Sequence, residues 1–191
     1  RGGAFLIVPS KSGSVFSRED FSDDQKMFVS AAEEFAVKRI QPVSKELNVL
    51  NKDLSLQIFK EMGELGFTGI DIPEEYGGLE LDKTTACIVA DVLSKGESAS
   101  MMVTFSAHTG IGTLPIIWYG NEEQKKKYLP KLASGEWMSC YALTEPSAGS
   151  DAMGGTTTAH LSDDGKYYIL NGQKIYITNG GWSEVCVTFA K

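Results

Sequence analysis

The sequence has few of the residues that mark disulfide-stabilised, metal-binding or membrane-spanning proteins. Its three cysteines lie far apart and form no Cys-x-x-Cys pair, which indicates a reducing interior compartment. Its two histidines have no cysteine or further histidine at ligand spacing, which argues against a metal site. No apolar run approaches the length of a membrane span, and residues 1–8 are too short for the apolar core of a secretory signal.

Positive charge is also scarce. With 18 Lys and Arg against 25 Asp and Glu, the formal net charge is −7, which argues against nucleic acid or an anionic membrane as a partner. Any anionic ligand must therefore be held by local donors. Hydrophobic residues make up 42% of the 191 residues, which is enough to form a core in one large domain or two small ones.

The first part of the chain has a helical pattern. Apolar residues recur at helical spacing in residues 23–39, after the capping-box pair Ser22 and Gln25, and this helix is expected to end before Pro42. The other helices are expected at residues 54–65, closed by Gly66, at 82–95, at 99–119 as one or more buried helices, and at 122–133, opened by Asn121 with Gln124.

After Gly135 the apolar residues alternate with a period of two, which is typical of strands. Asp163-Asp164-Gly165 and Asn171-Gly172 are hairpin-turn signals. Short strands are expected at residues 137–143, 156–161, 166–170, 174–178 and 184–190. The sequence therefore predicts an α+β chain with an N-terminal arm (1–20), an all-α helical domain (21–135) and the start of an antiparallel β-barrel-like domain (136–191).

Two stretches of the β part can present groups to a cofactor. Residues 141–151, Tyr-Ala-Leu-Thr-Glu-Pro-Ser-Ala-Gly-Ser-Asp, run from a strand into a tight turn, where N–H groups and hydroxyls can meet a phosphate or a flavin carbonyl edge. Residues 174–181, Lys-Ile-Tyr-Ile-Thr-Asn-Gly-Gly, place an aromatic ring and a hydroxyl before a Gly-Gly turn. Taken alone, the two stretches also fit an ordinary strand–turn and an ordinary edge strand.

Both stretches closely resemble the paired flavin-binding signatures of the acyl-CoA dehydrogenase family. Residues 144–151 match the family's Thr-Glu-Pro turn followed by Ala-Gly-Ser-Asp. The later stretch is similar to the family's Trp-Ile-Thr-Asn-Gly segment, with Tyr176 where Trp is common. Residues 72–78 resemble its Pro-Glu-Glu-Tyr-Gly-Gly segment, and residues 122–136 resemble its helix into the β domain. The resemblance covers residues 21–191, and residues 2–7 are similar to the long-chain branch.

The resemblance implies FAD as the cofactor and gives the first stretch a role at each matching residue. Backbone groups near Tyr141 and Leu143, together with the hydroxyl of Thr144, would hold the pyrimidine edge of FAD. Gly149 and Ser150 would lie by the diphosphate, with Ser150 also near the bound acyl-CoA.

The second stretch would lie against the flavin ring. The resemblance implies that Tyr176 and Ile177 cover one face of the flavin and that the hydroxyl of Thr178 donates to the reactive nitrogen, N5. The flavin carries the redox chemistry in such enzymes, while the protein supplies position and electrostatics.

The family reaction is the α,β-dehydrogenation of a fatty acyl-CoA to a trans-2-enoyl-CoA, a step of fatty acid β-oxidation that passes electrons to an electron-transfer flavoprotein. The glutamate that removes the α-proton comes from a C-terminal helical bundle in the family. Residues 185–191 alternate like a strand and then stop, so we expect a truncated chain without this bundle and its base. Glu145 is a turn residue in the family, not its base. A homodimer or homotetramer in the bacterial cytoplasm or mitochondrial matrix is also implied.

Other stretches of the sequence allow further interpretations. Residues 110–115 half-resemble a dinucleotide loop, but they lack its third glycine, end in Pro and follow no strand; in the family this segment helps to line the acyl pocket. The lysines at 125–127 fit a solvated helix face, with a contact to the flavoprotein partner as the alternative. An acyl-CoA oxidase or flavin monooxygenase on the same fold, or a non-catalytic assembly protein that reuses it, stays open as an alternative function.

Overall fold

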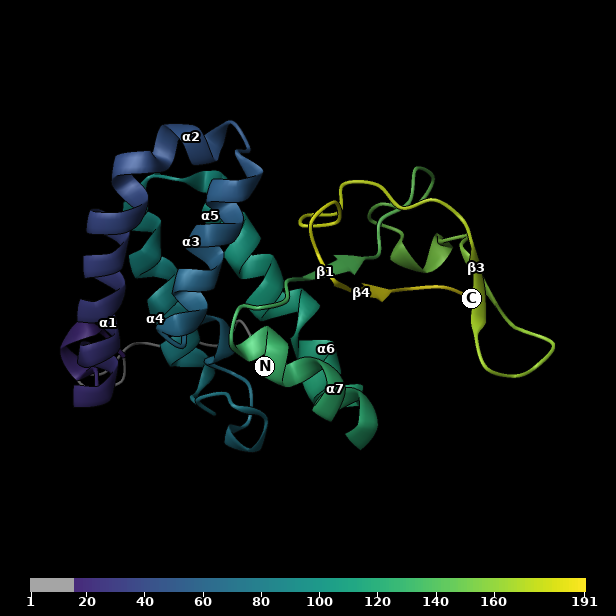
Figure 1. Cartoon of the computed structure of the whole chain (residues 1–191), viewed down its shortest axis with the longest axis horizontal. Coiled ribbons are helices and arrows are strands. Elements are labelled where there is room, and N and C mark those ends of the chain that lie inside the picture. Colours follow the sequence, from purple (N-terminus) through teal and green to yellow (C-terminus); the bar gives the residue numbers. More distant parts are fainter. Residues whose placement is uncertain (1–15) are drawn as a thin grey trace, which may run out of the picture.

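A computed structural model describes residues 16–191 and places the helices at one end of the molecule and the strands at the other (Figure 1). The expected arm before Phe16, and the resemblance of residues 2–7, lie outside the described residues. The helices are α1 (Asp23–Phe35), α2 (Ser44–Asn48), α3 (Lys52–Glu64), α4 (Lys83–Leu93), α5 (Ala99–Ser106), α6 (Leu114–Tyr119) and α7 (Glu122–Ala133). In this part of the chain no helix is both long and apolar enough to cross a bilayer.

Side-chain caps fix where several helices begin. The backbone N–H of Gln25 donates to the Ser22 hydroxyl and the Ser22 N–H donates back to the Gln25 side chain, both at 3.1 Å, so the expected capping box is confirmed. The same reciprocal pair joins Asn121 and Gln124 at 2.8 and 2.9 Å. Helix α7 consequently occupies the expected residues, Glu122–Ala133.

The core of the helical part forms between α1, α3, α4 and α5. Its largest side chains are almost completely buried, and burying each of them contributes roughly 1.5–3 kcal/mol. They are Ile40, Leu47, Ile58, Phe59, Met62, Phe67, Ile70, Leu93, Met101 and Phe105. A second cluster joins Leu129 and Leu132 of α7 to Ile72, Ile116 and Val185, so apolar packing also connects the helices to the strands.

Two expected helices differ in detail from the observed ones. α1 ends at Phe35 and a π-helical turn, Ala36–Ile40, follows it, so the helical stretch ends before Pro42 as expected, and a separate 3-10 turn, Gln41–Val43, comes next. Pro42 is accommodated because it stands in the first turn of a new helical segment, where a missing N–H costs nothing. Residues 99–119 form α5, a π-helical segment and α6, and the aromatic end of α6, Trp118 and Tyr119, is exposed.

The strands are β1 (Ser139–Ala142), β2 (Thr158–Leu161), β3 (Tyr168–Asn171) and β4 (Val185–Thr188). β2 and β3 form the expected antiparallel hairpin, whose turn contains Gly165 at φ 70°. β1 and β4 pair in parallel, with Cys140 opposite Cys186, which differs from the expected antiparallel arrangement. Parallel neighbours need a long crossover, and here the β2–β3 excursion provides it. The expected class, a helical domain followed by the start of a β domain, is confirmed, without a closed barrel in residues 16–191.

The expected strand at residues 174–178 is wrong, because this segment forms an irregular stretch followed by a turn. Asn171-Gly172 is not a hairpin turn either, since Asn171 simply ends β3. Gly172 is needed for close packing: a Cβ added there would lie 2.3 Å from the hydroxyl oxygen of Thr157. The β-forming residues of the segment are overridden by long-range contacts.

Candidate functional site

The chain turns back on itself directly after β1. Glu145 and Ala148 form an isolated antiparallel bridge, in which each N–H donates to the other's carbonyl at 3.1 Å. Pro146 fixes φ at the start of the turn. Gly149 and Ser150 follow on the exposed side. The first signature therefore folds as the strand and tight turn that its sequence predicts.

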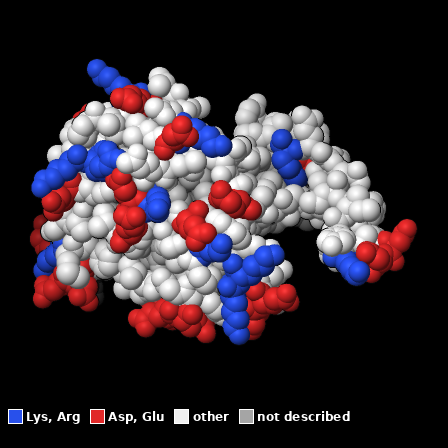
Figure 2. Space-filling view, viewed as in Figure 1, with Lys and Arg blue, Asp and Glu red and all other residues white. Residues whose placement is uncertain are grey.

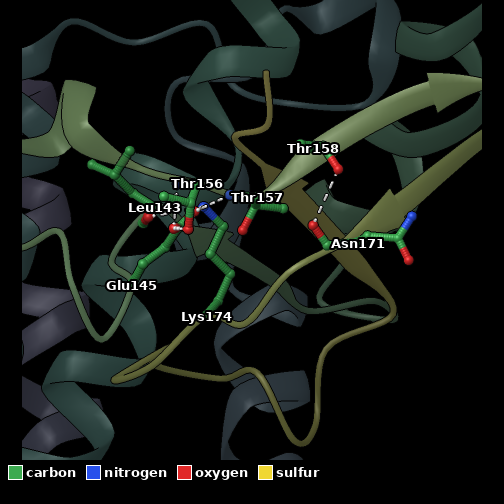
Figure 3. A network of polar contacts seen from close by, with 7 residues as sticks. All are labelled: Leu143, Glu145, Thr156, Thr157, Thr158, Asn171 and Lys174. Atoms are coloured by element: carbon green, nitrogen blue, oxygen red, sulfur yellow. Dashed lines mark hydrogen bonds and ion pairs between the residues drawn. The ribbon is translucent and has the colours of Figure 1, made fainter.

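A buried carboxylate lies beneath this turn, as Figure 3 shows. Glu145 is 3% exposed and accepts four hydrogen bonds. Thr156 donates its N–H at 2.5 Å and its hydroxyl at 2.9 Å, and Thr157 donates its N–H at 3.0 Å. The ammonium group of Lys174 donates at 2.7 Å. The carboxylate is thus surrounded by donors from residues 156–157 and from Lys174 of the second signature.

These donors set the acidity of Glu145. The Lys174 ammonium first, and then the donors of Thr157 and Thr156, hold the pKa of Glu145 well below its ordinary value of 4.5. A carboxylate held so firmly in its charged form is a weak proton acceptor, and all of its donors come from the protein itself. This environment argues against Glu145 as a catalytic base and fits the structural role assigned to it from the sequence.

The two signature segments lie side by side. The N–H of Ile175 donates to the carbonyl of Thr144 at 3.0 Å, and the Lys174 ammonium donates to the carbonyl of Leu143 at 3.0 Å. These partners are about thirty residues apart in the sequence. The fold therefore brings the end of β1 next to residues 174–178 without a regular strand pairing.

The predicted residues of the first signature lie in two places. Tyr141 and Leu143 line a cavity of about 350 Å³ together with Met153, and the Tyr141 ring packs 4.9 Å from the ring of Phe189. Thr144 is half-buried at the join with Ile175. Gly149 and Ser150 are on the exposed turn.

Two of the three predicted residues of the second signature, Ile177 and Thr178, lie beside helix α5. Tyr176 is 88% exposed and has a left-handed backbone with φ 58°, which is uncommon for a bulky residue and is found most often at functional sites. Ile177 and Thr178 are half-buried and line a groove of about 490 Å³ with Val103 and Thr104 of α5. The groove therefore joins the helical part to the segment that carries the predicted N5 donor.

Apolar side chains continue along the helical wall next to this groove. Val103 and Ile111 are 53% and 52% exposed, with Ala107 midway between them at the same spacing of four residues. Ala107 and Ile111 belong to the π-helical segment Ala107–Gly112, so the half-resemblance to a dinucleotide loop at 110–115 falls on helical structure that follows no strand. Ala107 itself is buried, so the exposed apolar surface is supplied by Val103 and Ile111, and apolar surface beside a half-buried hydroxyl suits a ligand that has a hydrocarbon part.

The donors that an anionic cofactor needs are present on the turn after β1. The backbone N–H groups of Ser147, Gly149 and Ser150 donate to no other residue within 16–191. A Cβ built on Gly149 meets no atom within 4 Å, so a ligand can approach the backbone there. Together with the exposed ring of Tyr176, these groups fit a flavin dinucleotide better than a small anion. In the described part of the chain, no three His, Cys, Asp or Glu residues are grouped so that they could hold a metal ion.

A buried polar network between helices and strands was not predicted from the sequence. His108 is fully buried; its Nε2 lies 3.2 Å from the Leu132 carbonyl, and its Nδ1 accepts the N–H of Ser139 at 3.1 Å. Burial lowers the pKa of His108 to about 4, so the ring is neutral. Asn179 joins the network through the carbonyls of Thr104 and Ser139. The sequence signal for it was slight, because its partners are 40 and 75 residues away from Asn179.

The lysines of α7 lie among carboxylates. Figure 2 shows basic and acidic side chains intermixed over this face of the molecule. Lys125 lies 3.7 Å from Glu122, and Lys131 lies 3.0 Å from Glu136. The interpretation of this helix as a solvated face is consistent with such pairing, and the alternative contact with a flavoprotein stays a prediction.

Comparison with known proteins identifies the family. The chain matches two domain descriptions, "Acyl-CoA dehydrogenase, N-terminal domain" over residues 22–136 and "Acyl-CoA dehydrogenase, middle domain" over residues 140–191. The fold is therefore that of the family's helical N-terminal domain followed by part of its middle β domain. The chain belongs to the acyl-CoA dehydrogenase family, whose members are oxidoreductases.

Individual relatives agree with this assignment. The chain is 44% identical over 191 residues to a probable acyl-CoA dehydrogenase of Bacillus subtilis (strain 168), covering 100% of this chain and 32% of that protein. It is 39% identical over 166 residues to the very long-chain specific acyl-CoA dehydrogenase, mitochondrial, of Homo sapiens, covering 83% of this chain and 25% of that protein. The chain therefore spans about a third or less of the length of these relatives.

A solved structure has the same fold over nearly the whole chain. The crystal structure of an acyl-CoA dehydrogenase complexed with FAD from Bacillus anthracis superposes with a TM-score of 0.92 at 46% identity. The match covers 99% of this chain and 32% of that chain. The arrangement of helices and strands described above is thus similar to that of a protein solved with a flavin.

Proposed function

We propose that the protein carrying this chain is an FAD-dependent acyl-CoA dehydrogenase of fatty acid β-oxidation, which converts a fatty acyl-CoA to a trans-2-enoyl-CoA. The observation that carries the proposal is the direct join of the two signature segments by the Ile175 N–H and the Thr144 carbonyl, at 3.0 Å. This join brings residues 143–144, which lead into the turn after β1, next to residues 174–175, which lead to Tyr176 and Thr178. FAD, when bound there, supplies the acceptor for the hydride.

In this proposal the first signature binds the dinucleotide. Backbone groups at Tyr141 and Leu143 and the hydroxyl of Thr144 hold the pyrimidine edge. The uncommitted N–H groups of the turn at Gly149 and Ser150 bind the diphosphate, which a local cluster of backbone donors can do in spite of the net negative charge. Ser150 also lies near the acyl-CoA.

The second signature orients the flavin ring. Tyr176 and Ile177 cover one face, and the outward position of the Tyr176 ring supports this role. The Thr178 hydroxyl would donate to N5 of a bound FAD, where such a donor would favour the reduced flavin. The half-burial of Thr178 keeps bulk water from competing for that hydrogen bond.

The acyl chain lies along the apolar wall of α5 and the π-helical segment, at Val103, Ala107 and Ile111. Exposed apolar surface of this kind favours a hydrocarbon chain, because each buried methylene contributes about 0.8 kcal/mol. From membership of the family, we propose that the base that takes the α-proton is a glutamate of the family's C-terminal helical bundle. Glu145 is committed to Lys174 and the donors of residues 156–157.

We also propose an electron-transfer flavoprotein as the electron acceptor and a homodimer or homotetramer as the assembly. Both follow from membership of the family. The reducing interior compartment inferred from the cysteines is then the bacterial cytoplasm or the mitochondrial matrix, which agrees with the bacterial and mitochondrial relatives.

The test uses the full-length protein that carries this chain. Purified protein should contain one FAD per chain, and anaerobic addition of a saturated acyl-CoA should bleach the flavin while enoyl-CoA accumulates. Rapid oxygen consumption with acyl-CoA would instead favour an oxidase or a monooxygenase. A protein that binds neither FAD nor acyl-CoA would contradict the proposal and favour the assembly role.

A further inference from the structure

Asn179 stands directly after the predicted N5 donor and has an unusual backbone. Its φ is 67°, in the left-handed region that Asn tolerates better than other residues with side chains. Its carbonyl accepts the N–H groups of Trp182 and Ser183, both at 2.9 Å, and so closes the turn that follows Thr178. The residue is 9% exposed, so its side chain points into the protein and not into solvent.

The side-chain amide of Asn179 joins three segments. Its Nδ2 donates to the carbonyl of Thr104 in α5 at 3.0 Å and to the carbonyl of Ser139 in β1 at 3.2 Å. Thr104 lies in the last turns of α5, just before the π-helical segment Ala107–Gly112, and π-helical segments occur frequently at functional sites. Both amide hydrogens are therefore used, whereas Oδ1 is buried with no partner among the described residues.

We propose that Asn179 is a positioning residue that holds the Thr178 hydroxyl and the Ile177 side chain in place against α5. This inference rests on the proposed function. Residues 174–178 have no strand pairing to fix them, so the position of Thr178 depends on the Ile175–Thr144 bond on one side and on Asn179 on the other. A donor displaced by a fraction of an ångström loses much of its effect on a reacting atom.

A purely structural role for Asn179, as one of several bonds between helices and strands, is the competing explanation. Ser139 offers a matched control, because its hydroxyl lies 3.1 Å from both the Thr113 hydroxyl and Nδ1 of His108. Ser139→Ala removes these contacts between helices and strands but keeps the backbone carbonyl that Asn179 uses. Ser139→Ala therefore weakens the contact between helices and strands but leaves both hydrogen bonds of the Asn179 amide in place.

The experiment compares Asn179→Gly, Asn179→Asp and Ser139→Ala in the full-length, FAD-loaded protein. Gly keeps the left-handed backbone and deletes the amide, whereas Asp keeps the shape and turns a carboxylate oxygen toward two carbonyls. Flavin reduction at saturating acyl-CoA should slow by up to about tenfold in both Asn179 variants. The loss should be no larger than that of Thr178→Val, which deletes the hydroxyl itself. The half-saturating acyl-CoA concentration should change little, and the FAD dissociation constant, from fluorescence quenching of the apoprotein, should rise. Ser139→Ala should lower the thermal midpoint but keep the reduction rate.

A double-mutant cycle with Thr178→Val completes the test. If Asn179 acts through the hydroxyl, Asn179→Gly should slow reduction much less in the Thr178→Val background than in the wild type. Additive losses, or a reduction rate in Asn179→Gly equal to that of Ser139→Ala, would overturn the inference. Wild-type protein that holds no FAD, or whose flavin is not bleached, would instead contradict the proposed function, and the inference would fall with it.

Discussion

The ammonium group of Lys174 lies 2.7 Å from Oε1 of Glu145 and 3.0 Å from the carbonyl oxygen of Leu143. One side chain from the second signature thus neutralises the carboxylate and binds the backbone of the first (Figure 3). Lys174 is also largely buried, so this pair is an internal element of the β part and not a surface ion pair. The relative position of the two signatures therefore depends on this contact.

Lys174→Met should destabilise the β part and loosen the join between the signatures. It leaves the Glu145 carboxylate buried without its cation, which is more harmful than removing both charges. We expect a lower thermal midpoint, and faster hydrogen exchange of the Ile175 N–H that donates to Thr144. Lys174→Met combined with Glu145→Gln should recover part of the lost stability. Lys166→Met, in an exposed pair with Asp164, is the control and should have little effect. Equal thermal midpoints for Lys174→Met and Lys166→Met would contradict the prediction.

The lowered pKa of Glu145 predicts a loss of stability in acid. Because the folded protein holds the carboxylate ionised, its contribution is fully present above the ordinary pKa of about 4.5 and is lost as the pH falls toward the lower folded value. Urea unfolding between pH 5 and 3 should therefore show a falling free energy of unfolding. Glu145→Gln, which cannot ionise, should be less stable at neutral pH and should have a shallower dependence on pH in this range.

The lowered pKa of His108 predicts a second loss of folding stability, which begins at a higher pH than that of Glu145. Its folded pKa of about 4 lies below the ordinary 6.5, so the unfolded chain binds a proton first as the pH falls. Stability is unaffected above about pH 6.5 and decreases between 6.5 and 4, by up to about 3 kcal/mol for the full difference. The protection factor of the Ser139 amide against hydrogen exchange should fall in the same pH range, because its N–H donates to the ring. An unchanged slope between pH 6.5 and 5 in His108→Gln would show that another group causes the effect.

The residues that were predicted well are those with local signals. Helix α7 begins at the Asn121 capping box and is followed by Gly135 at φ 69°, and both features are visible in the sequence. The segment 174–178 was predicted as a strand because its residues fit the period-two alternation that begins after Gly135. Its actual path is set by Thr144, Glu145 and other partners far away in the chain, and local propensity contains no information about them.

The candidate site shows the same division. The family motifs in the sequence identify the donors after β1 and the ring of Tyr176, because their chemistry is local. The contacts that fix their relative positions are made by Lys174, Asn179 and the carbonyl of Thr104, and they join residues that are 29 to 75 positions apart. Only the positive φ of Asn179, before two glycines, has a local signal, since Asn tolerates that backbone.

Val103→Asp should weaken acyl-CoA binding in the full-length protein. The Val103 side chain lines the groove beside Thr178. A carboxylate there would lose its hydration when a hydrocarbon chain covers it, and this cost weakens binding. We expect the dissociation constant for a long-chain acyl-CoA to rise by about tenfold or more, with a smaller change for a short-chain one. FAD content should be unchanged. Val37→Asp, at an exposed position outside the groove, is the control. An equal effect on all chain lengths would place the acyl chain elsewhere.

Thr178→Val tests the most specific part of the proposed site. Valine has the shape of threonine without the hydroxyl, and Thr178 is half-buried, so the change removes a hydrogen bond and little packing. N5 of an oxidised flavin is an acceptor, and a pre-positioned donor stabilises the charge that arrives there. We expect flavin reduction at saturating acyl-CoA to slow by roughly tenfold, about 1.4 kcal/mol, with little change in acyl-CoA affinity.

The competing explanation for Thr178 is that it only fills space beside α5, between Ile177 and Asn179. Valine would then be nearly silent, since a volume-conserving change at a half-buried position costs little unless a polar group is left unpaired. Stopped-flow bleaching of the flavin separates the two, and Thr178→Ser provides the control: it keeps the hydroxyl but loses the methyl group. If the hydroxyl matters, Ser should retain most of the reduction rate that Val loses. A Val variant as fast as wild type would remove Thr178 from the site.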